Sequence, residues 1–201
     1  MTYWHFPVLF ATGVAAGFVD AIAGGGGLIT VPVLLNLGLP PPVALGTNKL
    51  QASFGSGGAA WSYGRAGLID FPACRLGIAL SLLGSVAGSL AVRSLDVAFL
   101  RHLIPWLLVA IALYTLFRPQ FGAADIRPRL RAGVFYTLTG LVIGFYDGFF
   151  GPGTGSFWAV AFMLGLGFNL TRATAHTKIM NFASNVGSLL VFLLGGQVVC
   201  A

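Results

Sequence analysis

The stretch that decides the fold class runs from residue 17 to residue 32 and reads G-F-V-D-A-I-A-G-G-G-G-L-I-T-V-P. One aspartate and four consecutive glycines stand here inside an otherwise apolar passage. Glycine breaks a helix readily, and irregular backbone at membrane depth is tolerated only where protein or a water-filled cavity surrounds it. The stretch therefore predicts a helix that is broken inside a membrane protein. T-N-K-L-Q-A-S follows at residues 47–53.

A second passage repeats this pattern. Residues 144–156 read G-F-Y-D-G-F-F-G-P-G-T-G-S, and residues 176–181 read H-T-K-I-M-N. Asp20 and Lys49 are 29 residues apart in the first passage, and Asp147 and Lys178 are 31 residues apart in the second. The chain has no other lysine. The pattern predicts an internal repeat whose scarce charges form a two-fold site inside a membrane.

The composition identifies lipid as the solvent. Of the 201 residues 57% are hydrophobic and only 8% are charged, whereas an ordinary soluble domain carries roughly 25% charged residues. The net charge of +6 fits basic cytoplasmic loops better than nucleic-acid binding, so no nucleic-acid partner is expected. Cys74 and Cys200 have neither metal-ligand spacing nor a disulfide framework.

Apolar runs predict an all-α fold, a polytopic bundle of transmembrane helices. Most runs have the length of about 20 residues that a helix needs to cross hydrocarbon. The second and seventh are shorter, follow glycine clusters, and could be short helices, half-helices or re-entrant segments. The expected segments are His5–Ala23, Gly27–Leu39, Ala44–Tyr63, Pro72–Val92, Val97–Phe117, Ala132–Phe149, Thr154–Phe168 and Thr177–Val199.

The polar loop at residues 118–131 divides the chain and orients it. Its arginines predict a cytoplasmic location, and if every segment crosses the membrane, the N-terminus is external. Residues 1–125 then form the first repeat and residues 126–201 a second repeat that is truncated at its C-terminus. Because five segments precede the boundary, the second repeat begins on the opposite face, which is the inverted arrangement of many secondary transporters.

The glycine clusters and lysines predict an anion site. Helix starts with free N–H groups attract anions, and a charge at membrane depth costs roughly 2.5–3.5 kcal/mol and tends to mark function. Alternatively, the glycines allow close helix packing and the lysines snorkel to the interface. The candidate substrate-binding residues are Lys49, Lys178, Asn48, Gln51, Asn181, Gly25, Gly26, Gly27, Gly153 and Thr154, and Asn185 could add a further hydrogen bond.

Asp20, Asp147 and His176 are candidates for proton coupling or for salt bridges. Each aspartate could carry a proton, or could pair with the lysine of its own or of the other repeat when the site is empty. The alternative is that each caps a helix or pairs with an interfacial arginine. The sequence shows no metal-ligand cluster and no catalytic motif, so no enzyme activity and no cofactor are expected.

The two passages together resemble the sulfite exporter TauE/SafE family. The resemblance rests on the Asp, glycine-cluster and Lys motifs quoted above and covers essentially the whole chain. It implies a bacterial inner-membrane protein with duplicated motifs that moves sulfur-containing organic or inorganic anions out of the cell. Within the family, the chain is similar to the broadly distributed branch whose substrates are poorly assigned.

These observations favour a secondary transporter that exports a small sulfur-containing anion, such as sulfite or an organosulfonate, by alternating access. Its partners would be the lipid bilayer, the small anion and protons as coupling ion. A passive anion channel using the same residues is the alternative within transport. A non-transporting membrane scaffold or assembly protein is the alternative from another class.

Overall fold

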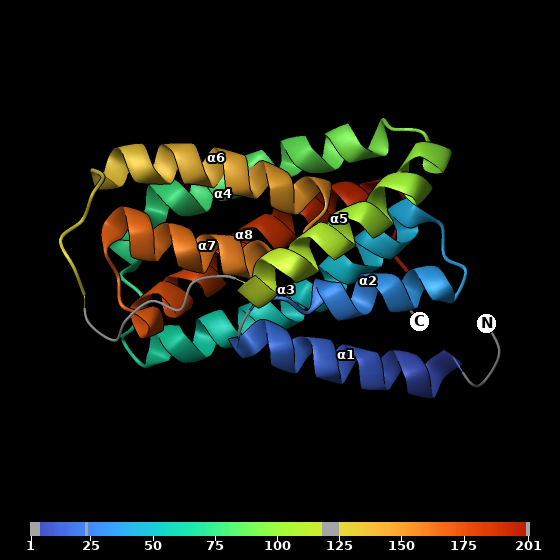
Figure 1. Cartoon of the computed structure of the whole chain (residues 1–201), viewed down its shortest axis with the longest axis horizontal. Coiled ribbons are helices and arrows are strands. Elements are labelled where there is room, and N and C mark those ends of the chain that lie inside the picture. Colours follow the sequence, from blue (N-terminus) through green and yellow to red (C-terminus); the bar gives the residue numbers. More distant parts are fainter. Residues whose placement is uncertain (1–4, 23, 118–124, 200–201) are drawn as a thin grey trace.

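The computed structural model describes residues 5–22, 24–117 and 125–199. These residues form helices and turns and contain no β-strand, so the all-α prediction is confirmed. The elements, drawn in Figure 1, are α1 (His5–Ile22), α2 (Gly27–Asn36), α3 (Pro41–Arg65), α4 (Phe71–Arg93), α5 (Val97–Phe117), α6 (Ala132–Phe149), α7 (Thr154–Ala161), the π-helical segment η1 (Phe162–Leu166) and α8 (Leu170–Leu194).

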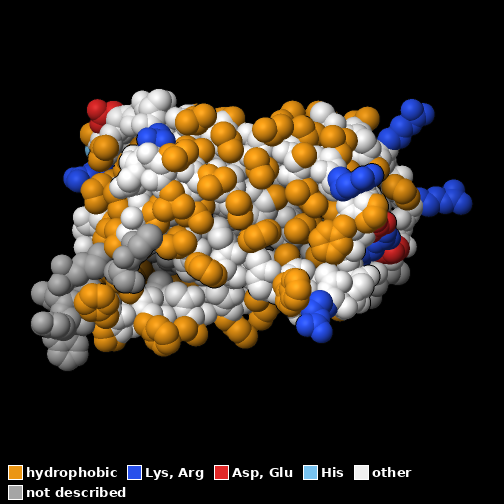
Figure 2. All heavy atoms as spheres, turned by 180° about the vertical axis from the view of Figure 1, so that it is seen from behind, with side chains coloured by type: hydrophobic (Ala, Val, Ile, Leu, Met, Phe, Trp, Pro, Cys, Tyr) orange, Lys and Arg blue, Asp and Glu red, His pale blue; other side chains and the backbone are white. Residues whose placement is uncertain are grey.

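The lateral surface of the bundle is apolar. Helices α4, α5, α6 and α8 are long and apolar enough to cross a membrane. Large apolar side chains are exposed around the bundle, including Phe10, Trp106 and Leu116, each about three-quarters exposed. Figure 2 shows hydrophobic side chains over the middle of one face and basic side chains near its two ends. This distribution suits a bundle whose middle lies in hydrocarbon.

The glycine clusters form the tips of two helical hairpins. Helices α1 and α2 make one hairpin, α6 and α7 make the other, and the two tips meet inside the bundle (Figure 1). The amide of Gly155 donates to the carbonyl of Gly24 at 3.1 Å. A Cβ atom on Gly155 would lie 2.5 Å from the Cα of Gly24, so a larger side chain at this contact would force the tips apart.

The second and seventh segments, which the sequence left open between short helices, half-helices and re-entrant segments, are short apolar helices. Helix α2 has 10 residues, which span about 15 Å, half of the roughly 30 Å of hydrocarbon. Both hairpins return to the end of the bundle from which they came (Figure 1). A hairpin that returns leaves the chain on the same side as two full crossings would. The turns between the other helices therefore lie on the sides that were expected for them. The α3–α4 turn, residues 125–131 and the turn before α8 share one end.

Some predicted segment boundaries differ from the helices. Helix α8 begins at Leu170, seven residues before the expected Thr177, because the side chain of Asn169 caps it by accepting a hydrogen bond from the amide of Arg172 at 2.9 Å. The seventh segment changes from α-helix to π-helix at Phe162. Ala23, Arg118 and Cys200, on which some expectations fell, lie outside the described residues.

Helices α4 and α6 pack through small residues. A Cβ atom on Gly88 would lie 2.0 Å from the carbonyl oxygen of Phe145, and one on Gly144 would lie 2.6 Å from that of Ser81. The hydroxyl of Ser89 donates to the carbonyl of Gly148 at 3.1 Å. Such close backbone contact is the usual way helices associate in lipid, and it holds the α6–α7 hairpin against a membrane-crossing helix.

Candidate functional site

Lys49 is fully enclosed in the protein. It is the ninth residue of α3 and is only 1% exposed, so it does not snorkel to the interface. Its ammonium donates to the main-chain oxygen of Asp147 at 2.5 Å, to Oδ1 of the same residue at 2.6 Å and to Oδ1 of Asn185 at 3.3 Å. An ammonium has three hydrogens, and all three are used in these contacts.

Lys178 makes the corresponding contact, in which a lysine of the second passage binds the aspartate of the first. It is the ninth residue of α8 and is 1% exposed. Its ammonium donates to the main-chain oxygen of Asp20 at 2.7 Å. Each lysine therefore reaches the carbonyl of the aspartate in the other sequence passage, so the pairing runs between the passages and not within them.

The two aspartate side chains have different surroundings. The carboxylate of Asp147 accepts hydrogen bonds from Lys49, from the hydroxyl of Thr154 at 3.2 Å and from the hydroxyl of Ser184. The carboxylate of Asp20 accepts one from the amide of Gly26 at 2.7 Å. Its second oxygen, Oδ2, is buried and has no hydrogen-bond partner among the described residues.

These groups surround a cavity of about 20 Å³ between the hairpin tips. Most of the residues expected at the site meet here, which brings the two passages together at one place. The lining residues are Asp20, Gly24, Gly27, Asn48, Lys49, Ala52, Asp147, Gly151, Gly153, Thr154, Asn181 and Asn185.

The helix starts after the glycine clusters are already occupied by protein groups. At the start of α2, the amide of Gly26 binds Asp20, and the carbonyls of Gly25 and Gly26 accept bonds from the first turn. At the start of α7, the amide of Thr154 donates to the carbonyl of Gly151, and that of Gly155 donates across to Gly24. The amides expected to bind an anion are thus largely used in internal contacts.

Five candidate residues do not line the central cavity: Gly25, Gly26, Gln51, His176 and Lys178. Lys178 lines a larger pocket of about 300 Å³, together with Ile22, Tyr63, Gly155, Ala159, Leu170, Thr171, Thr174 and Thr177. Gln51 accepts a bond from Thr30 at 3.4 Å and lines a different pocket of about 200 Å³.

His176 belongs to neither pocket. Its ring lies tilted against the rings of Phe162 and Phe168, with centroid distances of 5.7 and 4.9 Å. Its Nδ1 lies 2.9 Å from the carbonyl of Arg172, and its Nε2 accepts from the amide of Asp70 at 3.3 Å. Since both ring nitrogens are engaged, the ring here holds two helix ends together.

Ser184 and Asn185 complete the site. Asn185 was expected to add a hydrogen bond, and it accepts one from Lys49 at 3.3 Å. It lies on α8 with Lys178 and Asn181 at the i, i+3, i+7 spacing of one helix face. Ser184, also on α8, was absent from the candidate residues. The contact of Ser184 with Asp147 depends on how α6 packs against α8, which the sequence of either helix does not reveal.

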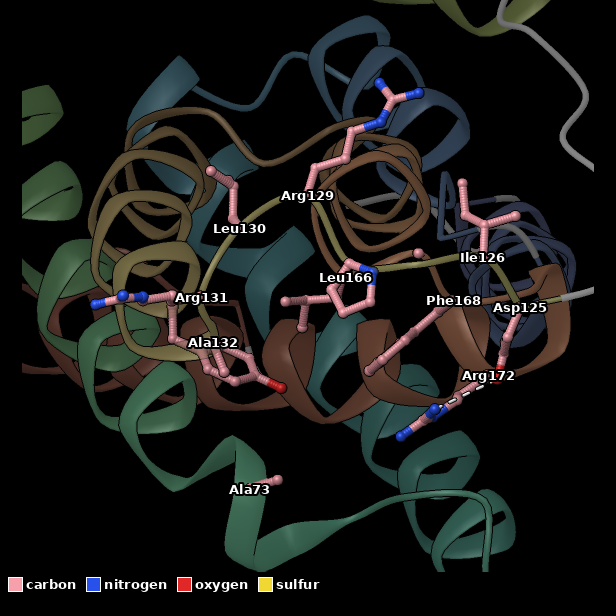
Figure 3. A pocket seen from close by; sticks show the side chains of 13 residues that line it. Ala73, Asp125, Ile126, Arg129, Leu130, Arg131, Ala132, Leu166, Phe168 and Arg172 are labelled. Carbon is pink, nitrogen blue, oxygen red and sulfur yellow. Dashed lines mark hydrogen bonds and ion pairs between the residues drawn. The ribbon is translucent and has the colours of Figure 1, made fainter.

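A larger cavity lies elsewhere. It measures about 640 Å³ and lies between the segment before α6 and the ends of η1 and α8. Arg129 and Arg131 point in different directions away from it, and Arg172 pairs with Asp125 at 3.4 Å (Figure 3). Because these arginines do not converge on a common point, this cavity is not the candidate anion site.

Enclosed charges at the meeting point of two broken helices, inside a bundle with an apolar outer surface, define a multi-pass membrane protein with a polar centre. Comparison with known proteins specifies the class further. The family model described as sulfite exporter TauE/SafE matches residues 9–200. The chain belongs to this family of membrane transporters.

Individual relatives agree with this assignment. A "probable membrane transporter protein" of Haemophilus influenzae is 49% identical over 191 residues, which cover 95% of this chain and 75% of the relative. The "probable membrane transporter protein YfcA" of Escherichia coli K12 is 46% identical over 194 residues, 96% of this chain and 72% of the relative. YdhB of Bacillus subtilis, which has the same description, is 24% identical over 198 residues, 95% of this chain and 78% of the relative. No solved structure matches the chain significantly.

Proposed function

We propose that this protein is a secondary transporter that exports a small sulfur-containing anion, of the sulfite or organosulfonate class, by alternating access between two inverted repeats. The observation that carries the proposal is the position of Lys178. Its ammonium binds the main-chain oxygen of Asp20 at the tip of the α1–α2 hairpin, and the residue also lines the 300 Å³ pocket. The sulfur class is taken from the description of the family.

The 300 Å³ pocket has the chemistry of a small-anion site. Its volume lies at the lower end of the range for small-molecule pockets, about 300–1,000 Å³. Four residues with hydroxyl groups, Thr171, Thr174, Thr177 and Tyr63, line it beside Lys178, and the hydroxyl of Thr177 already donates to the carbonyl of Ala173. A sulfonate or sulfite group carries three oxygens that accept hydrogen bonds, and this pocket offers hydroxyl and ammonium donors to them.

Anion binding at Lys178 would weaken a contact between the passages. The ammonium donates to the main-chain carbonyl of Asp20, in the last turn of α1 in the α1–α2 hairpin. An anion that draws the ammonium toward itself competes with that carbonyl and loosens the hairpin tip. Part of the binding energy of the substrate thus offsets the loss of this contact. The first passage can then move relative to the second, as alternating access requires.

A second pocket supports access from the opposite end. It measures about 200 Å³ and is lined by Leu9, Thr12, Gly13, Thr30, Leu34, Leu39, Thr47, Gln51 and Val199. Leu39 lies in the α2–α3 turn, at the other end of the bundle from the start of α8, where Thr171 lies (Figure 1). The central cluster of charges separates the two pockets, as a closed gate between two vestibules would.

A ligand screen tests the proposal. The thermal unfolding midpoint of the detergent-purified protein is measured with sulfite, sulfoacetate, taurine, thiosulfate, sulfate and non-sulfur anions. We expect one sulfur anion to stabilise the protein and the Lys178→Met variant to lose this effect. Loss of a charge-assisted hydrogen bond worth about 1.5–3 kcal/mol weakens binding roughly 10- to 100-fold.

The matched control is Arg65→Met, which removes the same charge at an exposed position at the end of α3. It should bind the anion as the natural chain does. Equal loss in both variants would show a general charge effect and not a site. If anion flux in proteoliposomes is unchanged in the Lys49→Met, Lys178→Met double variant, the proposed transport mechanism through these lysines is wrong. Flux that no ion gradient stimulates would identify a channel, and no flux with a co-purifying partner would identify a scaffold.

A further inference from the structure

The central cavity collects buried oxygen atoms that have no hydrogen-bond donor. Oδ2 of Asp20, Oδ1 of Asn48 and Oδ1 of Asn181 are all buried without a partner among the described residues. The three residues are only 9%, 2% and 7% exposed, respectively, and all line the cavity of about 20 Å³. Buried acceptors without partners are uncommon in folded proteins and call for a physical explanation.

Several donors around the cavity are already engaged elsewhere. Lys49 donates to Asp147 and Asn185. The amide of Gly26 is bound to the other oxygen of Asp20, and the hydroxyl of Thr154 is within reach of Asp147 and of the carbonyl of Gly151. None of these groups reaches the three oxygens, which a positively charged ligand would satisfy.

Two helix ends add negative potential at the same place. Asp20 and Asp147 lie in the last turns of α1 and α6, which end at Ile22 and Phe149. The C-terminal end of a helix carries a partial negative charge of about half an elementary charge. Discontinuous helices in membrane transporters use such ends and unwound carbonyls to coordinate cations.

We infer that this cavity binds one monovalent alkali cation, sodium, through Asp20, Asn48 and Asn181. One carboxylate and two amide oxygens supply a single negative charge, whereas calcium takes six to eight oxygen ligands and magnesium a strict octahedron with several waters. The cavity has room for one species about the size of a water molecule. A water molecule has two hydrogens and leaves one of the three acceptors unsatisfied, while a cation is attracted to all three.

The position of the cation would link the two sequence passages. Its ligands come from α1, α3 and α8, and therefore from both passages. The paired charges of Lys49 and Asp147 cancel next to it, and the ammonium of Lys178 is held by the main-chain oxygen of Asp20. A sodium ion bound here would hold the tip of the α1–α2 hairpin to α3 and α8 and so act as the coupling ion; this role, though not the binding itself, rests on the proposed transport function.

The test compares sodium chloride with choline chloride at equal ionic strength and without any substrate anion. The thermal unfolding midpoint of the full chain is measured against sodium concentration, and binding of radioactive ²²Na⁺ is measured by equilibrium methods. We expect a saturable rise of about 5 °C or more when sodium exceeds its dissociation constant roughly 100-fold. Asp20→Asn and Asn48→Ala should each weaken ²²Na⁺ binding at least about tenfold, because each variant loses one contact that is about as strong as a hydrogen bond.

Ser188→Ala is the matched control. The hydroxyl of Ser188 is also buried without a partner on α8, but it does not line the cavity, so this variant should bind sodium as the natural chain does. Equal midpoints in sodium and choline without ²²Na⁺ binding would overturn the inference. So would binding that persists unchanged in Asn48→Ala and Asp20→Asn. A response to pH alone would assign the cavity to a proton instead.

The same measurements separate this inference from the transport proposal. Anion flux that persists in sodium-free choline buffer, with no ²²Na⁺ binding, would reject the sodium site and leave anion transport standing. Saturable ²²Na⁺ binding without a response to any anion would retain the site and reject the proposed substrate.

Discussion

The ammonium of Lys49 lies 2.6 Å from Oδ1 of Asp147, although 98 residues separate the two in the chain. Lys178 likewise reaches Asp20 across 158 residues. Each contact joins one sequence passage to the other, so neither passage can neutralise its charges alone. This exchange supports the proposal that the passages are repeats facing each other about a common centre.

Breaking the Lys49–Asp147 pair should destabilise the protein strongly. Removal of one partner of a buried ion pair leaves an uncompensated charge and typically costs about 3–5 kcal/mol. We expect Lys49→Met alone and Asp147→Asn alone each to lower the free energy of unfolding by about this amount. The measurement is reversible unfolding in mixed detergent micelles.

The double variant Lys49→Met, Asp147→Asn carries the decisive comparison. It leaves no unpaired charge, so its loss should be smaller than the sum of the two single losses, with a coupling of at least about 1 kcal/mol. Simple additivity would contradict a direct pairing. Because the carboxylate of Asp147 also accepts from Thr154 and Ser184, the double variant should still fall short of the natural chain.

A serine pair on α8 tests the surroundings of Asp147. Ser184 donates to its carboxylate, whereas Ser188, one turn further on, has a buried hydroxyl with no partner. We expect Ser184→Ala to cost about 1.5–3 kcal/mol, the value of a buried hydrogen bond to a charged group. Ser188→Ala should cost almost nothing. The measurement is thermal unfolding of the two variants under the same conditions. Equal losses of stability would show that the contact of Ser184 with Asp147 contributes nothing.

Much of this arrangement could be predicted from the sequence because charge is so scarce. In a chain that is 8% charged, a buried lysine must find a partner, and the repeated spacing indicated which residues to expect. The prediction left open whether each aspartate pairs with the lysine of its own passage or of the other. That choice depends on how the hairpins dock, which is a tertiary property.

The anion site at the helix starts shows where sequence reasoning stops. Glycine clusters predict free amides, but the Asp20 side chain folds back onto Gly26 and the Gly155 amide reaches Gly24. These contacts occur because the tips approach closely enough for backbones to touch. Likewise, the early start of α8 depends on the Asn169 cap, because apolar runs mark hydrocarbon and not helix ends.

The α4–α6 contact should not tolerate a methyl group at Gly88. Its Cβ would lie 2.0 Å from the carbonyl oxygen of Phe145 and 2.7 Å from the amide of Phe149, so the helices must separate. Overpacking of this kind typically costs about 1–3 kcal/mol, more than the gain of about 1 kcal/mol in helix propensity. We expect Gly88→Ala to lower the unfolding midpoint. Gly133→Ala on α6, where nothing lies within 4 Å, is the control and should not lower the midpoint.

The orientation of the bundle leads to a labelling experiment. Arg65, Arg75, Arg127, Arg129, Arg131 and Arg172 belong to the end that holds residues 125–131, and Arg93 and Arg101 flank the turn at the other end, between α4 and α5. The excess of arginine predicts that the first end faces the cytoplasm. A cysteine at Ser94 should therefore react with a membrane-impermeant maleimide in spheroplasts, and one at Arg129 should react only after lysis. Cys74 is buried and can stay, while Cys200→Ser removes the other thiol. Labelling of Arg129→Cys in intact spheroplasts would show that the topology is the reverse. The 300 Å³ pocket would then not lie toward the cytoplasmic side, from which an exported anion must enter.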